Sequence, residues 1–211
     1  FSTAEEMEAA TGFSELADSE GFVVLYPEGM GFLGFLQHWN AGHCCGKAAE
    51  IDLDDVAFLR EGIELLSRVL PIDTARIYMA GFSNGGMLVH RFAAEQSNTL
   101  AAAAVLGAAV GGRSGPQEDF WLPSLPDVPV PMLLFHGLQD DAVPADGGKS
   151  PRKGGTREYV SLQKSVDFWL KANNCSKKHT ATGSYDGAVI LKKWEDCAND
   201  SSVLLYTLED W

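Results

Sequence analysis

Short, continuous apolar runs recur along the chain, and stripes with helical spacing separate them. Four runs bounded by glycine, proline or polar residues predict buried strands, at 21–29, 75–81, 100–110 and 130–137. Two further strands are predicted around 189–194 and 203–207, near the end of the chain. Runs that are apolar on both faces are typical of a parallel sheet that helices cover on both sides. The pattern therefore predicts an α/β fold.

The predicted helices follow from apolar residues at intervals of three and four. One stripe consists of Val56, Leu59, Ile63, Leu66 and Leu70. It predicts a helix that Asp52 caps and Pro71 ends. Residues 84–96 predict a second helix. Leu162, Val166, Trp169 and Leu170 mark a third, which is expected to end near Asn173-Asn174. Ser2-Thr3 with Glu5-Glu6 forms capping boxes for a short helix at the N-terminus. No linker or repeat interrupts the pattern, so one domain spanning 1–211 is expected.

The glycine-rich segment 29–49 has no clear period and predicts a long, irregular loop. Trp39 and Asn40 lie in it and are candidate substrate-binding residues, with simple loop packing as the alternative. His43 is expected to be exposed. The acidic residues at 52–55 are interpreted as a helix cap and not as a metal site.

Charge narrows the range of partners. The chain has 16 Lys and Arg against 29 Asp and Glu, a formal net charge of −13. Nucleic acids and anionic membrane surfaces require a basic face, so neither is expected as a partner. No apolar run approaches the roughly 20 residues that cross a bilayer. The chain begins without Met, which is typical of the inside of a domain.

The four cysteines are Cys44, Cys45, Cys175 and Cys197, and their spacing matches no zinc motif. Cys175 and Cys197 flank a predicted hairpin and are candidates for a disulfide. The adjacent Cys44 and Cys45 allow either a vicinal bridge or two separate partners. Four buried thiols are the alternative, but the pattern favours an oxidising compartment.

The segment Gly81-Phe82-Ser83-Asn84-Gly85 has the G-x-S-x-G pattern of a nucleophile elbow. It lies between a predicted strand and a predicted helix, where a sharp turn would expose Ser83. Gly81 and Gly85 are expected to let the strand and helix approach closely, and Gly86 is expected to add room. The Asn84 N–H, at the helix start, is the candidate oxyanion donor. A glycine-rich turn with an incidental serine is the alternative.

A serine nucleophile needs a base and an acid that orients the base. Asp140 follows the strand predicted at 130–137 and is the candidate acid, preferred over Asp141. Four histidines precede it: His38, His43, His90 and His136. His136 is expected to shape the turn. His179 lies in a lysine-flanked loop, where a solvated role is expected. The base is therefore expected just beyond Trp211.

Five stretches in order along most of the chain carry a family resemblance: ATGFSELADSEGFVVLYPEG, WNAGHCCGKAAEIDLDDVAFLR, RIYMAGFSNGGM, LLFHGLQDDAVP and WLKANNC. They resemble the polyhydroxybutyrate depolymerase and feruloyl esterase-like family of secreted α/β-hydrolases, near the acetylxylan and feruloyl carbohydrate esterases. The resemblance implies a three-layer α/β-hydrolase fold, with Ser83 as nucleophile and Asp140 as triad acid. It also implies a Gly-His segment after Trp211 and a second oxyanion donor before Phe1, so the N- and C-terminal pieces of the fold are expected to be missing.

The resulting prediction is a secreted serine esterase that forms an acyl-enzyme on Ser83 and needs no cofactor or metal. Its expected substrate is a polyhydroxyalkanoate polyester or a feruloyl or acetyl ester of a plant polysaccharide. Two alternatives stay open: a non-catalytic binding protein with a hydrolase fold, and a serine peptidase on the same scaffold.

Overall fold

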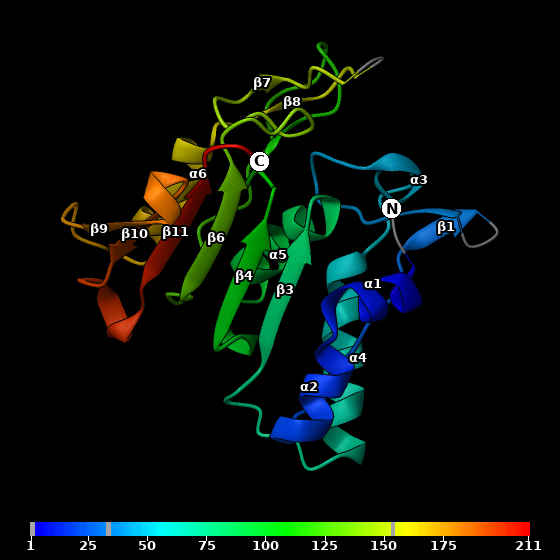
Figure 1. Cartoon of the computed structure of the whole chain (residues 1–211). Helices are drawn as coiled ribbons and strands as arrows, with labels where there is room; N and C mark the ends of the chain where they lie inside the picture. The colour runs from blue at the N-terminus through cyan, green and yellow to red at the C-terminus, as the bar shows by residue number, and fades with distance from the viewer. Residues whose placement is uncertain (1–2, 33–34, 153–154) are drawn as a thin grey trace.

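A mixed six-stranded sheet forms the centre of the molecule (Figure 1), in a computed structural model that describes residues 3–32, 35–152 and 155–211. The strand order is β3-β4-β6-β11-β10-β9. The bounds are β3 Tyr78–Phe82, β4 Ala102–Leu106, β6 Met132–Gly137, β9 Thr180–Ser184, β10 Val189–Trp194 and β11 Val203–Leu208. The first four strands in this order are parallel, and β10 runs antiparallel to both of its neighbours. The parallel half agrees with the sequence, while the antiparallel edge makes the sheet mixed.

The helices are α1 Ala4–Thr11, α2 Phe13–Glu20, α3 Gly46–Glu50, α4 Asp55–Val69, α5 Asn84–Glu95 and α6 Leu162–Ala172. Short 3-10 turns occur at Ser97–Thr99, Tyr185–Gly187 and Ala198–Asp200. The predicted capping box forms at Thr3 and Glu6, each accepting from the backbone N–H of the other, at 3.1 and 2.9 Å. The cap of α4 is Asp54, which accepts from the Ala57 N–H at 2.9 Å, and not the predicted Asp52.

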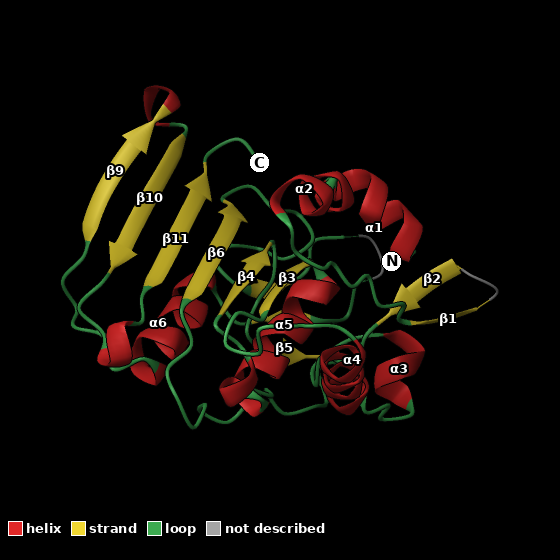
Figure 2. Ribbon diagram, turned by 90° about the horizontal axis from the view of Figure 1, so that it is seen from below, coloured by secondary structure: helices red, strands yellow, loops and turns green. Residues whose placement is uncertain are grey.

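Helices cover the two faces of the sheet unequally. Figure 2 shows α4, α5 and α6 on one side of the strands, with α1 and α2 on the other. The first group encloses a core whose largest fully buried side chains include Trp169, Phe92 and Met87. On the other side, α1 and α2 bury only Ala17, and Tyr78 of β3 stays 66% exposed. Among the described residues, the expected three-layer sandwich is therefore well packed on one face only.

The strand predicted at 21–29 is absent as such. Residues 22–29 belong to no helix and no ladder among the described residues. Phe22, Val23 and Leu25 are each about half exposed. An apolar run becomes a strand only when a neighbour satisfies its backbone hydrogen bonds, and this segment has no such neighbour in the described chain.

The segment predicted as an irregular loop contains regular structure. Strands β1 Met30–Phe32 and β2 Phe35–His38 form an antiparallel hairpin, and α3 follows; residues 33–34 lie outside the described part. A second small sheet has the order β5-β8-β7, with bounds Gly112–Arg113, Glu158–Tyr159 and Gly148–Lys149. Its strands come from the loops that leave β4 and β6, so it stands at the carboxyl edge of the main sheet (Figure 1).

All four cysteines are paired. Cys175 is bonded to Cys197, the pair suggested by the sequence, and Cys44 is bonded to Cys45, which is the vicinal alternative. The first disulfide joins the segment after α6 to the segment between β10 and β11. None of the helices in the described ranges has the length and apolar character needed to cross a membrane.

Candidate active site

Ser83 occupies the turn between β3 and α5 in a strained conformation. Its φ of 53° and ψ of −122° lie in a region that residues with a Cβ rarely adopt, at a cost of about 1–3 kcal/mol. Two hydrogen bonds hold it there: the Ser83 N–H donates to the Leu106 carbonyl at 2.9 Å, and the Met87 N–H donates to the Ser83 carbonyl at 2.9 Å. Backbone strain of this kind is characteristic of nucleophile elbows.

Two glycines allow the tight turn, but not quite the predicted pair. A Cβ on Gly81 would overlap the Gly85 carbonyl oxygen. A Cβ on Gly86 would lie 2.9 Å from the Gly81 oxygen and 2.9 Å from the Ala108 Cβ. By contrast, a Cβ on Gly85 would meet nothing within 4 Å among the described residues. The close approach therefore requires Gly81 and Gly86. The prediction that it also requires Gly85 was wrong.

Asn84 uses its side chain and its backbone differently. The side chain is buried, accepts from the Trp39 N–H at 2.8 Å and donates to the Trp39 carbonyl at 3.0 Å. Its backbone N–H belongs to the first residue of α5, where helical amides have no acceptor within the helix. Within the described ranges no other group accepts from this N–H. The amide is thus available at the positive end of the helix dipole.

Asp140 lies in the turn after β6 and is only 17% exposed. Its Oδ1 accepts from the Ala142 N–H at 2.7 Å and from the Val143 N–H at 2.9 Å. Its Oδ2 lies beside Gly107, because a Cβ built there would be 3.5 Å from this oxygen. The same Cβ would be 3.3 Å from the ring of Phe82, the residue before Ser83. Asp140 therefore presents a carboxylate oxygen at the carboxyl ends of β3 and β4.

The neighbouring carboxylate is placed differently. The Asp141 side chain is 76% exposed, and its Oδ1 lies 3.6 Å from Arg152 Nε. A solvated ion pair of this kind contributes little and points away from a site. Asp140 is therefore the less exposed of the two carboxylates, and its role as the acid stays a prediction.

Trp211 lies close to the residues that precede Ser83 and Asp140. Its carbonyl accepts from the Gln139 N–H at 3.1 Å, and its ring centroid is 6.3 Å from that of Phe82. Figure 1 shows this end of the chain at the carboxyl edge of the sheet. Trp211, three residues past the end of β11, thus lies beside Phe82 and Gln139, the residues that precede Ser83 and Asp140.

His179 is far from this place. It precedes β9, whose Thr180 pairs with Lys193 of β10. The residue after Lys193 is Trp194, which pairs with Val203, the first residue of β11. His179 therefore lies at the amino ends of the parallel strands, and β9 is five strand spacings from β3, on the order of 24 Å. This supports the expectation that His179 is not the base of Ser83.

His43 was predicted to be exposed, and that was wrong. It is 2% exposed, with its ring centroid 5.8 Å from Trp121 and 6.1 Å from Tyr159. Burial lowers the pKa of His43 to about 4, because an imidazolium loses its hydration there. This burial could not be predicted from the sequence, because the covering residues lie more than 70 positions away.

The other two buried histidines are structural. His90 on α5 is fully buried and accepts from the Trp169 indole N–H through Nδ1 at 2.9 Å. Burial lowers the pKa of His90 to about 3. His136 is the second-last residue of β6, with Nε2 2.8 Å from the Val143 carbonyl. It therefore shapes the turn that carries Asp140, as expected.

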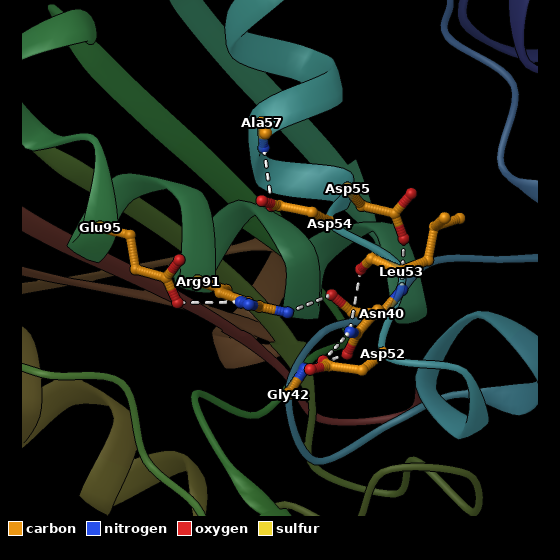
Figure 3. A network of polar contacts seen from close by, with 9 residues as sticks. All are labelled: Asn40, Gly42, Asp52, Leu53, Asp54, Asp55, Ala57, Arg91 and Glu95. Atoms are coloured by element: carbon orange, nitrogen blue, oxygen red, sulfur yellow. Dashed lines mark hydrogen bonds and ion pairs between the residues drawn. The ribbon is translucent and has the colours of Figure 1, made fainter.

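Asn40 is the centre of a buried polar network (Figure 3). Its N–H donates to Asp55 Oδ2 at 2.6 Å, and its Nδ2 donates to Asp52 Oδ1 at 3.0 Å. Its Oδ1 accepts from the Gly42 N–H, and its carbonyl accepts from Arg91 Nη1, both at 3.0 Å. Burial raises the pKa of Asp55, although the Asn40 N–H and Arg91 oppose the rise. Asn40 has no polar group left over for a substrate, so the geometry gives it a structural role.

Trp39 contributes its backbone and its ring in different directions. The backbone pairs with Asn84, next to Ser83. The half-buried ring lies 6.3 Å from the ring of Phe58 on α4, roughly parallel to it. Substrate contact by Trp39 stays a prediction. The pairing with Asn84 crosses 45 positions in the sequence and had no signal there.

Three known proteins are similar to this chain. Feruloyl esterase B of Piromyces equi is 30% identical over 216 residues, covering 98% of this chain and 36% of that protein. A Nocardia uniformis subsp. tsuyamanensis protein, provisionally named esterase NocK, is 28% identical, covering 96% of this chain and 58% of that protein. The bifunctional acetylxylan esterase/xylanase XynS20E of Neocallimastix patriciarum is 32% identical over 134 residues, covering 63% of this chain and 17% of that protein. No protein-family model matches the chain.

These relatives support an esterase family for the chain, as the resemblance implied. None of the three is named as a polyhydroxybutyrate depolymerase, so that part of the resemblance gains no support from them. The chain spans 36% of the first relative and 58% of the second.

Proposed function

We propose that this chain carries the nucleophile and the acid of a serine esterase with an α/β-hydrolase fold. The observation that carries the proposal is the strained backbone of Ser83 at a strand-to-helix turn. Two further observations support it. Asp140 follows β6, which is the second strand from β3 in the sheet. The relatives named as esterases are the other support. We place the reaction within one domain comprising 1–211, completed by other parts of the whole protein.

In the proposed mechanism, Ser83 Oγ attacks the ester carbonyl while a base accepts its proton. The Asn84 N–H, at the start of α5, donates to the oxygen as it becomes negative. The base then protonates the departing alcohol, which leaves an acyl group on Ser83. Water, deprotonated by the same base, releases the acid product. Asp140 Oδ2 orients the base and stabilises its charge.

We assign the base to a histidine that the whole protein supplies after Trp211. The support is positional. The Trp211 carbonyl is bonded to the Gln139 N–H, and its ring lies near Phe82. Because Trp211 lies beside the residues that precede Ser83 and Asp140, we expect a residue that follows it to be within reach of both.

The proposed substrate is a feruloyl or acetyl ester on a plant polysaccharide. The printed names of two relatives, a feruloyl esterase and an acetylxylan esterase, support this class. The proposed location is extracellular, because both disulfides would persist in an oxidising environment.

The test uses the full-length protein and its Ser83→Ala variant. Wild type should hydrolyse methyl ferulate or acetylated xylan and react with a fluorophosphonate probe, and Ser83→Ala should lose both properties. 3-Hydroxybutyrate oligomers and peptides complete the substrate panel. Cleavage of those compounds alone would redirect the substrate assignment. Full esterase activity in Ser83→Ala would overturn the mechanism.

A further inference from the structure

The Asn84 side chain forms a two-point clamp on the loop beside the elbow. It is 4% exposed and bonds both the N–H and the carbonyl of Trp39, at 2.8 and 3.0 Å. This is the pairing that a neighbouring strand would supply, made instead by one amide side chain. Its Nδ2 also lies 3.9 Å from Cys44 Sγ. The residue next to the candidate nucleophile is therefore fixed to a separate part of the chain.

The loop that receives the clamp is itself held firmly. The Cys45 N–H donates to the same Trp39 carbonyl at 3.1 Å, and the Ala41 N–H donates to the Cys44 carbonyl. Arg91 binds the Asn40 carbonyl at 3.0 Å from α5. Asn84 and Arg91 are seven residues apart, or two turns along one face of that helix. The loop therefore lies along α5 and is fastened at the first helical residue and again two turns later.

We propose that the Asn84 side chain is a positioning residue for the reaction, distinct from the oxyanion role assigned to its backbone. The clamp fixes the plane of the first α5 amide and the backbone angles of Ser83. The conformation of Ser83 is not in a low-energy backbone well, because its φ is +53°. Without an external anchor the turn would relax, and both the hydroxyl and the Asn84 N–H would move. This inference rests on the proposed esterase function.

The chain contains a matched control for the clamp. Asn173, fully buried at the end of α6, bonds the N–H and carbonyl of Val130 at 3.0 and 2.8 Å. The strand residue level with Phe82 is Phe135, two strands away. Val130 lies five positions before it, about 17 Å along the strand. The same pair of hydrogen bonds is thus available far from the site.

The experiment compares Asn84→Asp, Asn84→Ala and Asn173→Ala in the full-length protein. Asn84→Asp has the same shape and keeps the acceptor for the Trp39 N–H, but it loses the donor to the Trp39 carbonyl. Both alanine variants should lower the melting temperature, by about 5–10 °C. Only the Asn84 variants should lower kcat, by about 10- to 100-fold with KM within threefold. Their rate of phosphonylation by the fluorophosphonate probe should fall in proportion.

Three outcomes are informative. A fall in kcat and in labelling rate confined to the Asn84 variants would support the positioning role. Unchanged kcat in Asn84→Asp, or an equal fall in Asn173→Ala, would overturn it and leave Asn84 as a stabilising residue. Failure of the esterase proposal is separate, because wild type would then show no activity that depends on Ser83.

Discussion

Two loops border Ser83, and they use their polar groups in opposite ways. In loop 39–45, the polar groups of Asn40 are all bonded within the protein, and Trp39 is clamped by Asn84. In the turn after β6, Asp140 Oδ1 accepts hydrogen bonds from two backbone N–H groups. Within the described ranges, Asp140 Oδ2 accepts no hydrogen bond. The first loop is built to hold geometry. The second holds one oxygen in place and leaves the other available for proton chemistry.

The largest effect should come from replacing the carboxylate of Asp140. Asp140→Asn should lower kcat/KM on the preferred ester by about 10³- to 10⁴-fold, because the base loses its orientation and its charge partner. Asp141→Asn is the matched control and should stay within about twofold, since its side chain is exposed. Steady-state kinetics of both variants decide this. Near-normal activity in Asp140→Asn would remove the distinction between the two loops.

The buried histidine of the first loop should make stability depend on pH. His43 has a folded pKa of about 4, below its ordinary value of about 6.5. The neutral form is thus favoured by folding, and its contribution is present above pH 6.5 and lost as pH falls toward 4. The loss should be about 3 kcal/mol.

The measurement is urea unfolding at pH 7 and pH 4 for wild type and His43→Phe. The variant should lose about 3 kcal/mol less than wild type over this interval. His90, whose pKa is lowered to about 3, is present in both proteins, so most of its contribution cancels in the difference, although the His43 charge is one cause of that lowering. Equal losses in the two proteins would mean that His43 is protonated without cost and that the loop is more open than the structure indicates.

The next prediction tests whether Asn40 stabilises loop 39–45 or contacts the substrate. Asn40→Ala removes side-chain bonds to Asp52 and Gly42 and should cost about 1–3 kcal/mol of unfolding free energy. KM for the ester should change less than twofold. A tenfold rise in KM with unchanged stability would instead restore Asn40 as a substrate contact. Chemical denaturation and ester kinetics on one preparation give both numbers.

The smallest effect concerns the elbow between the two loops. Gly85→Ala places a methyl group in open space and should stabilise α5 by about 0.5–1 kcal/mol, because alanine loses less backbone entropy. Gly86→Ala pushes against Gly81 and Ala108 and should destabilise by about 1–3 kcal/mol. Thermal melts of the two variants should shift in opposite directions. A shift in the same direction would contradict the packing described at the turn.

Local periodicity predicted the elements that pack against one another, and the sequence was less informative where partners are distant. The helix of Val56 and Leu59 and the strand–turn–helix around Ser83 form as expected, because their patterns are local. The strand expected at 21–29 does not form, because a ladder needs a neighbour as well as apolar residues. Strand β9 was missed since its sequence, TATGS, is polar and fully exposed at the sheet edge.

The candidate site divides in the same way. Ser83, Asp140 and the Asn84 amide follow from motifs that span a few residues around strand ends. The Asn84 side-chain clamp and the burial of His43 depend on contacts across 45 and 78 or more positions. No pattern in a single sequence encodes such pairs, so these features appear only when the chain is folded.

The disulfide between Cys175 and Cys197 also determines whether proteolysis in β9 releases a fragment. It closes a loop that contains all of β9 and β10. Strand β9 is exposed along its whole length and is the accessible outer edge of the sheet. A cut there opens the backbone but releases no fragment, because the disulfide still joins the two sides. Nicked protein would run as one band on a gel until a reductant is added, and as two bands afterwards.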